Sequence, residues 1–143
     1  MKDWQEKIAD LQRAGLTLRV EKAGREIFSS SEPMLRPLLL CLQQRRSDMA
    51  GAAVIDKIVG RAAAYLCVKG KVAEVITPLA SHGAQEVLQQ AGIPLHALRV
   101  VAQIMNRDNT GPCPMEQLAG EALSADGFYQ ALCTRIAVKT ASD

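Results

Sequence analysis

In its middle third the sequence alternates two short apolar runs with two helix-like segments. Residues 50–55 carry no polar side chain and end abruptly at Asp56, and residues 72–77 form a second run. Helix-like segments follow each run, at about 58–68 and 80–90. A crossover helix between two strands makes them parallel, and a strand without polar side chains needs cover on both faces. The pattern therefore predicts an α/β fold with a parallel pair of strands at its centre.

The segments before this centre predict a helix, a hairpin and a second helix. In residues 3–14, Trp4, Ile8 and Leu11 recur at helical spacing and indicate an amphipathic helix. Residues 16–22 and 25–29 alternate with period two and predict an antiparallel hairpin. Residues 31–46 predict a helix, although Pro37 would remove a hydrogen bond if it lay beyond the first turn.

The segments after the centre predict one more strand and two helices. Residues 98–104 suit a fifth strand, but their apolar positions also fit a helix. A polar loop at 106–112 leads into a helix at 114–123, and a last helix follows, with a tail expected to fray after Lys139. We expect a single domain over residues 1–143, with an N-terminal amphipathic helix and a C-terminal helix.

Composition indicates a soluble protein of the cytoplasm. The chain has 143 residues, of which 48% are hydrophobic and 22% charged, and its apolar runs are too short to cross a bilayer. The amino terminus lacks the apolar core of a secretion signal, so we expect the four cysteines to be reduced, without a disulfide.

Charge and aromatic content argue against nucleic acid as a partner. The formal net charge is only +2, and the chain has two Phe, two Tyr and one Trp. Nucleic-acid binding needs a basic surface or aromatic platforms for stacking bases. We expect neither nucleic acid nor a membrane to be a partner.

Two polar motifs stand at junctions between a predicted strand and a predicted helix. Residues 56–64 read Asp-Lys-Ile-Val-Gly-Arg-Ala-Ala-Ala, and residues 106–116 read Asn-Arg-Asp-Asn-Thr-Gly-Pro-Cys-Pro-Met-Glu. In α/β domains such junctions meet at the carboxyl edge of the sheet, where helix amino termini converge on ligands. We interpret the two motifs as halves of one site.

These motifs, with the order of elements, resemble a small prokaryotic family of uncharacterised domains that is grouped with the cytidine-deaminase-like superfamily. The resemblance covers about residues 16–123. It implies a three-layer α/β/α sandwich with a five-stranded mixed sheet in the order 2-1-3-4-5, and no settled activity.

The resemblance does not extend to the zinc centre of that superfamily. Zinc deaminases place His or Cys, with Glu two residues on, at one helix start and Pro-Cys-x-x-Cys at the next. Here Asp56 takes the first position with Ile58 in place of the glutamate, and Glu116 replaces the second cysteine. Without imidazole this set suits catalytic zinc poorly, so we expect no metal cofactor and no conventional deaminase activity.

The first motif predicts a capped helix start, whose two basic side chains are either solvated or bound to an anion. Asp56 suits the N-cap position, and it could also accept hydrogen bonds from a ligand or act as a general base. Lys57 and Arg61 would be neighbours one turn apart on the helix that follows. Two cations at the positive end of a helix oppose its dipole unless an anion lies there, so they favour a phosphate or carboxylate ligand.

The second motif predicts an unusual helix cap. Because Pro114 suits the first helical position, Cys113 becomes the N-cap and Glu116 the third residue, the arrangement of a capping box. Helix N-termini and a nearby Arg107 favour the thiolate form of cysteine. Cys41, Cys67 and Cys133 lie in apolar contexts and are expected in the core, and His82 and His96 at the surface or in caps.

Three functional hypotheses follow. In the leading one the domain binds an anionic, nucleotide-like metabolite, with residues Asp56, Lys57, Gly60, Arg61, Asn106, Arg107, Thr110 and Gly111 around it. In the second, Cys113 is a nucleophile or redox-sensitive thiol, with Asp56 or Glu116 handling protons. In the third, the first helix and the face from Leu35 to Leu42 form a homodimer or partner surface.

Overall fold

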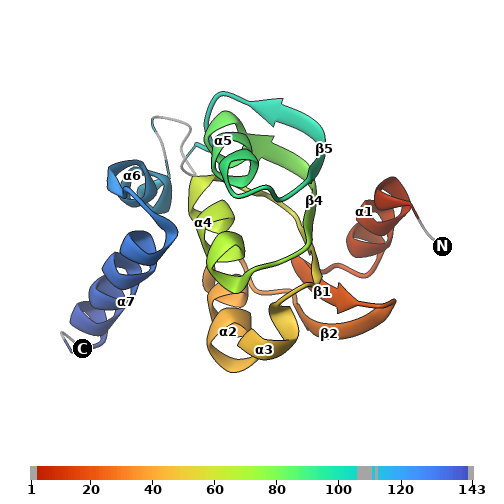
Figure 1. Ribbon diagram of the computed structural model, residues 1–143, viewed down its shortest axis with the longest axis horizontal. Helices are drawn as coiled ribbons and strands as arrows, with labels where there is room; N and C mark the ends of the chain where they lie inside the picture. Colours follow the sequence, from red (N-terminus) through yellow and green to blue (C-terminus); the bar gives the residue numbers. More distant parts are fainter. Residues whose placement is uncertain (1–2, 106–110, 112, 142–143) are drawn as a thin grey trace.

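The structure is a computed structural model that describes residues 3–105, 111 and 113–141, with side chains through residue 135. A central five-stranded sheet separates α1 on one side from the remaining helices on the other (Figure 1). The strands are β1 (Leu18–Lys22), β2 (Arg25–Ser30), β3 (Ala53–Asp56), β4 (Glu74–Ser81) and β5 (Leu95–Val101). The helices are α1 (Trp4–Arg13), α2 (Arg36–Gln44), α3 (Arg46–Met49), α4 (Arg61–Gly70), α5 (His82–Gln90), α6 (Pro114–Glu121) and α7 (Ala125–Ala141).

The sheet has the order β2-β1-β3-β4-β5. Strand β1 pairs antiparallel with both β2 and β3, whereas β3, β4 and β5 are parallel. Helix α4 connects β3 to β4, and α5 connects β4 to β5. Each helix brings the chain back to the end of the sheet where the previous strand began, so the three strands run parallel. The predicted α/β class, mixed sheet and strand order are confirmed.

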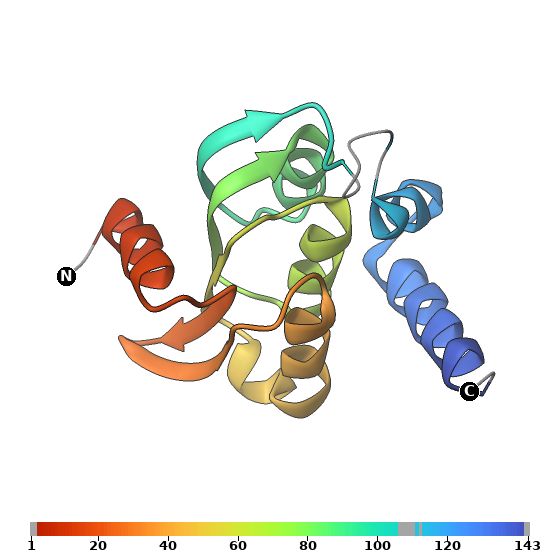
Figure 2. The same cartoon turned by 180° about the vertical axis from the view of Figure 1, so that it is seen from behind.

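One face of the sheet is covered by α1 alone. Its buried Ile8 and Leu11 pack against Ile55 of β3 and Ile76 of β4. At the edge of this layer Trp4 stacks on His96 of β5, with ring centroids 5.7 Å apart. His96, expected at the surface or in a cap, is therefore half-buried in a ring contact. Viewed from behind, α1 lies apart from all other helices (Figure 2).

The other face is covered by several helices, with α4 in a central position. Helix α4 packs against α5, α6 and α7, and six of its residues are buried, Ala62, Ala63, Ala64, Leu66, Cys67 and Gly70. The ring of Tyr65 stacks on the fully buried Phe128 of α7 at 5.7 Å between centroids. The prediction that this helix is mostly buried is confirmed, because it is enclosed between the sheet and the two C-terminal helices.

Three predicted boundaries differ from the observed ones. Helix α2 begins at Arg36, so Pro37 lies in its first turn, where no hydrogen bond is lost. Residues 95–101 form a strand, three residues earlier than predicted, because β5 pairs with β4 along its length. Helix α7 continues to Ala141, past the expected fraying point at Lys139.

The apolar faces expected to form a partner surface are buried within the chain itself. Leu38, Leu39 and Leu42 of α2 belong to the main core, and the apolar residues of α1 pack on the sheet. These residues are therefore engaged within the chain, and a homodimer or partner surface stays a prediction. Among the described residues, no helix combines the length and apolar character needed to span a membrane.

Substitution of Phe128 by Ala should show how strongly α7 is held against α4. Removing this buried ring leaves a cavity, and we expect the free energy of unfolding to fall by about 3–5 kcal/mol in urea denaturation. Leu123, fully exposed in the α6–α7 connection, provides the control, since Leu123→Ala should change stability by less than about 0.5 kcal/mol. Equal effects of the two substitutions would contradict the observed packing of α7.

Candidate functional site

The connection from β3 to α4 is longer than the sequence suggested. Asp56 is the last residue of β3, Gly60 is the N-cap of α4, and the helix begins at Arg61. The intervening chain is held by β4, since Val59 donates a hydrogen bond to the Leu79 carbonyl at 2.9 Å. Asp56 is therefore not the cap of this helix. Lys57 is not one turn from Arg61 on a common helix, because it precedes the helix altogether.

The cap of α4 comes from another helix. One carboxylate oxygen of Glu116, in the first turn of α6, accepts a hydrogen bond from the Arg61 backbone N–H at 2.8 Å. The other oxygen accepts from the Ala62 N–H at 3.0 Å. Glu116 was expected to close a capping box within α6, but the backbone N–H of Cys113 donates to the Ile104 carbonyl instead.

Gly60 allows the Glu116 carboxylate to approach the start of α4. A Cβ atom added at Gly60 would lie 2.2 Å from Oε1 of Glu116 and 2.5 Å from its carboxyl carbon. Such distances are far inside van der Waals contact, so any side chain here would displace the carboxylate. The glycine of the first motif and the glutamate of the second are therefore complementary parts of one contact.

This cap fills the place expected for an anionic ligand. The amino terminus of a helix carries roughly half a positive charge and unpaired N–H groups, which together attract anions. At α4 two of these N–H groups are bonded to a carboxylate of the chain itself. The positive end of α4 is therefore already neutralised.

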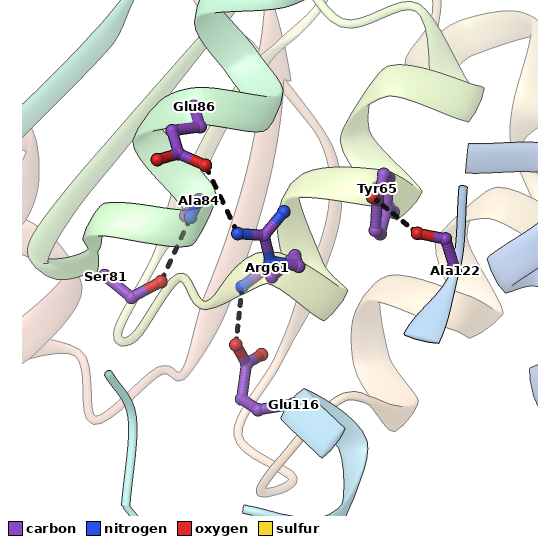
Figure 3. A network of polar contacts seen from close by, with 7 residues as sticks. All are labelled: Arg61, Tyr65, Ser81, Ala84, Glu86, Glu116 and Ala122. Carbon is purple, nitrogen blue, oxygen red and sulfur yellow. Dashed lines mark hydrogen bonds and ion pairs between the residues drawn. The ribbon is translucent and has the colours of Figure 1, made fainter. Parts of the chain in front are cut away.

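The side chain of Arg61 points away from Asp56, toward α5. Its guanidinium lies against Gly83, where an added Cβ would be 2.8 Å from Nε, and it pairs with Glu86 at 3.4 Å. Figure 3 shows the Arg61 backbone facing Glu116 while the guanidinium points to Glu86. Arg61 lines a separate cavity of about 240 Å³, next to Ser81 at the start of α5. The predicted pairing of Arg61 with Lys57 around one anion is not observed.

A larger cavity of about 770 Å³ lies between the starts of α4 and α6. Two acids, Asp56 and Glu116, and one base, Lys57, are its charged lining residues within the described part of the chain. The rest of the lining consists of small, apolar or weakly polar residues, Thr17, Pro33, Met34, Leu35, Ile58, Gly60, Ala62, Ala63, Ile104, Met105, Cys113, Pro114 and Met115. Described residues of both motifs therefore line one cavity, and its role as a binding or catalytic site stays a prediction.

Asp56 is the most perturbed charged group of this cavity. Only 9% of its surface is exposed, and this burial raises the pKa of its carboxyl to about 7. Hydrogen bonds from the backbone N–H groups of Lys57 and Ile58 act in the opposite direction but are the smaller effect. None of the ion pairs found among the described residues involves Asp56. A buried carboxyl without a cationic partner, in a cavity, is the combination that marks ligand-binding and catalytic groups.

Two of the three cysteines expected in the core, Cys41 and Cys67, are buried, whereas Cys133 is only partly buried. Cys113 is the half-exposed N-cap of α6, with Pro114 first in the helix and no side-chain capping bond. Cys41 and Cys67 are buried, and burial is the main cause that raises the pKa of both thiols. Cys133 on α7 is half-buried. Cys113 is thus the cysteine that shares a cavity with Asp56.

The residues at the position of a deaminase zinc do not fit the metal. Both carboxylate oxygens of Glu116 are bonded to backbone N–H groups of α4, which withdraws them from coordination. Asp56 and Cys113 remain, without an imidazole, and zinc sites need three or four ligands. In the part of the chain covered by the structure, no cluster of three or more His, Cys, Asp or Glu side chains could hold a metal ion.

Some predicted ligand-binding residues do not line the cavity in the described part of the chain. Asn106, Arg107 and Thr110 lie outside the described residues, and Gly111 does not line the cavity.

Other walls of the cavity come from residues that the sequence motifs did not include, namely Thr17, residues 33–35, Ile104 and Met105. These residues carry no motif and reach the cavity only through the fold.

Fold and site together define an α/β/α domain with a ligand-sized cavity at the carboxyl edge of β3, closed by a glutamate shared between two helices. The chain belongs to the DUF1893 family, described as a domain of unknown function, whose model matches residues 7–136. No curated protein matches the sequence significantly.

Solved structures support the fold. The crystal structure of a DUF1893 family protein from Thermotoga maritima is similar, with a TM-score of 0.83 and 23% identity over 92% of this chain and 88% of that one. Forms 1 and 2 of Acinetobacter baumannii RibD give TM-scores of 0.48 and 0.46 at 16% and 17% identity, over 66% and 90% of this chain and 33% and 38% of theirs. The Thermotoga maritima structure therefore supports the fold alone.

Substitution of Gly60 by Ala should break the cap of α4. We expect the free energy of unfolding to fall by about 2 kcal/mol, the cost of a lost cap plus local strain. In the Glu116→Ala background the same change should cost much less, because the clashing carboxylate is gone. Gly120→Ala within α6, where a Cβ meets nothing within 4 Å, should instead stabilise by up to about 1 kcal/mol. Additive losses in the double variant would contradict the shared contact.

Asp56 should make stability depend on pH in a direction unusual for a carboxylate. Its pKa is raised from 3.8 to about 7 in the folded protein, so between these values the folded state holds a proton that the unfolded state has lost. Stability from this group is thus greatest at low pH and falls as pH rises toward 7, by about 1.4 kcal/mol per pH unit.

The isosteric variant Asp56→Asn cannot ionise, so its stability relative to wild type should rise between pH 5 and pH 7 and level off above. Thermal or urea denaturation at several pH values measures this difference. Asp48→Asn, at an exposed position of α3, is the control for loss of a surface charge. A constant difference between Asp56→Asn and wild type across this range would show that Asp56 is ionised normally.

Proposed function

We propose that this domain binds a small molecule in the cavity between the starts of α4 and α6. The observation that carries the proposal is the cavity of about 770 Å³ with the buried Asp56 carboxyl in its wall, which forms no ion pair with the described residues. Small-molecule sites typically measure about 300–1,000 Å³ and combine apolar walls with a few polar groups. Size and lining both match that description.

The apolar part of the lining supports an apolar ligand body. Five large apolar side chains are exposed in the described part of the chain, and three of them, Met34, Ile58 and Met105, line this cavity with 67%, 42% and 36% of their surface exposed. Exposed apolar side chains that gather in one place mark interaction sites. With Met115, three of the five methionines of the chain face the cavity, and methionine adapts its shape to ligands.

The rim of the cavity contains a strained residue held in place by hydrogen bonds. Met34 has a φ of 68°, a left-handed conformation that costs a residue with a side chain about 1–2 kcal/mol. The loop before it is fixed to β1, since the Thr17 hydroxyl donates to the carbonyls of Ser30 and Glu32. Strain of this kind tends to occur at functional sites. Here the strained residue, Met34, lies in the loop that forms one wall of the cavity.

The electrostatics support a different polar group from the expected phosphate. The α4 terminus is capped by Glu116, and Arg61 is engaged with Glu86. Among the described lining residues this leaves Lys57 as the base. The nucleotide-like anion therefore stays a prediction that rests on Lys57 and Arg107, whereas an apolar body with a hydrogen-bond donor toward Asp56 fits the observed contacts better.

Methionine methyl NMR can test this proposal directly. In protein labelled with ¹³C at the methionine methyl groups, a library of small aromatic fragments should shift the signals of Met34, Met105 and Met115. Met49, buried in the core near Gly70, serves as an internal control and should not move.

A pair of cysteine variants tests whether the shifts come from the cavity. Cys113→Phe fills part of the cavity wall and should weaken fragment binding several-fold. Cys133→Phe alters a half-buried cysteine of α7 that does not line the cavity, and should leave binding unchanged. A library in which no fragment at millimolar concentration moves the three signals would count decisively against the proposal.

A further inference from the structure

We infer that the cavity selects amphiphilic cations, which place an aromatic or aliphatic body against the methionines and a basic nitrogen group on the carboxylate of Asp56. This inference rests on the proposed function and specifies its ligand class. The inferred ligand is a cation, whereas the basic residues of the two motifs predicted an anion.

The first argument is the charge balance of the lining. Two acids and one base line the cavity within the described residues. Glu116 is bonded through both oxygens to α4, so its charge is compensated by backbone N–H groups. Lys57 is exposed, where water screens its charge strongly. Asp56 is nine-tenths buried, and in that setting its charge acts on a ligand with the least screening.

The second argument is that Asp56 has no cationic partner within the described part of the chain. The backbone N–H groups of Lys57 and Ile58 favour its charged form, but no lysine or arginine among the described residues forms an ion pair with it. Burying a carboxylate without a partner is costly, and a bound cation removes that cost. An amidine or guanidine group would add two parallel, charge-assisted hydrogen bonds.

The third argument is the shape and polarity of the remaining wall. The side chains of Met34, Met105 and Met115 offer polarisable sulfur atoms, which contact aromatic rings favourably. Ala62 and Ala63 of α4 add small apolar side chains to the same lining. A planar ring that carries a basic group satisfies both the apolar wall and the single buried acid.

Three nearly isosteric probes separate charge from shape: 2-naphthamidine, 2-naphthamide and 2-naphthoate. Their affinities for the full chain would be measured by methionine methyl NMR titration at pH 8, where Asp56 is mostly ionised. We expect the amidine to bind about tenfold more tightly than the amide, and the naphthoate to bind least, because only the amidine pairs with the carboxylate.

Two variants assign the selectivity to Asp56. In Asp56→Asn the preference for the amidine over the amide should disappear, while the amide still binds. Lys57→Ala, at an exposed position, keeps Asp56 and removes the lining base, so it should strengthen amidine binding about two- to threefold and weaken naphthoate binding. Circular dichroism tests whether each variant is folded. If Asp56→Asn does not fold, the binding changes in Lys57→Ala decide whether the cavity prefers a cation.

The outcomes distinguish the two proposals. If the amide or the naphthoate binds as tightly as the amidine, or if the preference survives in Asp56→Asn, the cationic ligand class is overturned while binding in the cavity stands. If none of the three probes moves the signals of Met34, Met105 and Met115, the cavity itself is not the site, and the proposed function fails as well.

Discussion

The site is organised by one interaction, the Glu116 carboxylate on the backbone N–H groups at the start of α4. It joins α6, which follows the last strand, to the central helix that follows β3. It requires Gly60, because no side chain could share that space with the carboxylate. It also fixes the wall of the cavity, since Cys113, Pro114 and Met115 immediately precede Glu116 in the chain and all line it.

The same interaction determines the electrostatic character of the cavity. A helix terminus that would otherwise attract an external anion is neutralised by a group of the chain. The positive side chain next to it, Arg61, is drawn to Glu86 on α5 and lines a different cavity. What remains in the larger cavity is an apolar wall, the exposed Lys57 and the buried Asp56, whose burial raises its pKa to about 7. Such a group is destabilising in isolation, which is the physical reason to connect it with a ligand.

The position of Asp56 also follows from this arrangement. Asp56 lies at the end of β3, before the helix rather than on it. The first turn of α4 is capped by Glu116 of α6, so Asp56 is not needed as the cap of α4. The two acids of the cavity therefore have different roles, because Glu116 joins two helices and Asp56 does not.

Local pattern in the sequence was sufficient for the elements and their order. Alternating strand and helix periods specify the two crossovers, and the crossovers specify parallel strands, so the mixed sheet could be predicted without coordinates. The proximity of residues 56–63 and 113–116 around one cavity also followed, because both segments stand at the same edge of the sheet. The N-cap position of Cys113 followed from Pro114 alone.

The contacts inside the site were decided only by the tertiary structure. Asp56 and Lys57 looked like the start of a helix, but pairing of Val59 with β4 delays that start to Arg61. Glu116 was predicted to bond to Cys113, the N-cap of its own helix, but its carboxylate accepts hydrogen bonds from two backbone N–H groups of α4. The cavity walls from Thr17 and from residues 33–35 come from distant loops. Periodicity along a chain encodes which face of an element is buried, whereas the partner of a polar side chain depends on distances across the fold that no local pattern contains.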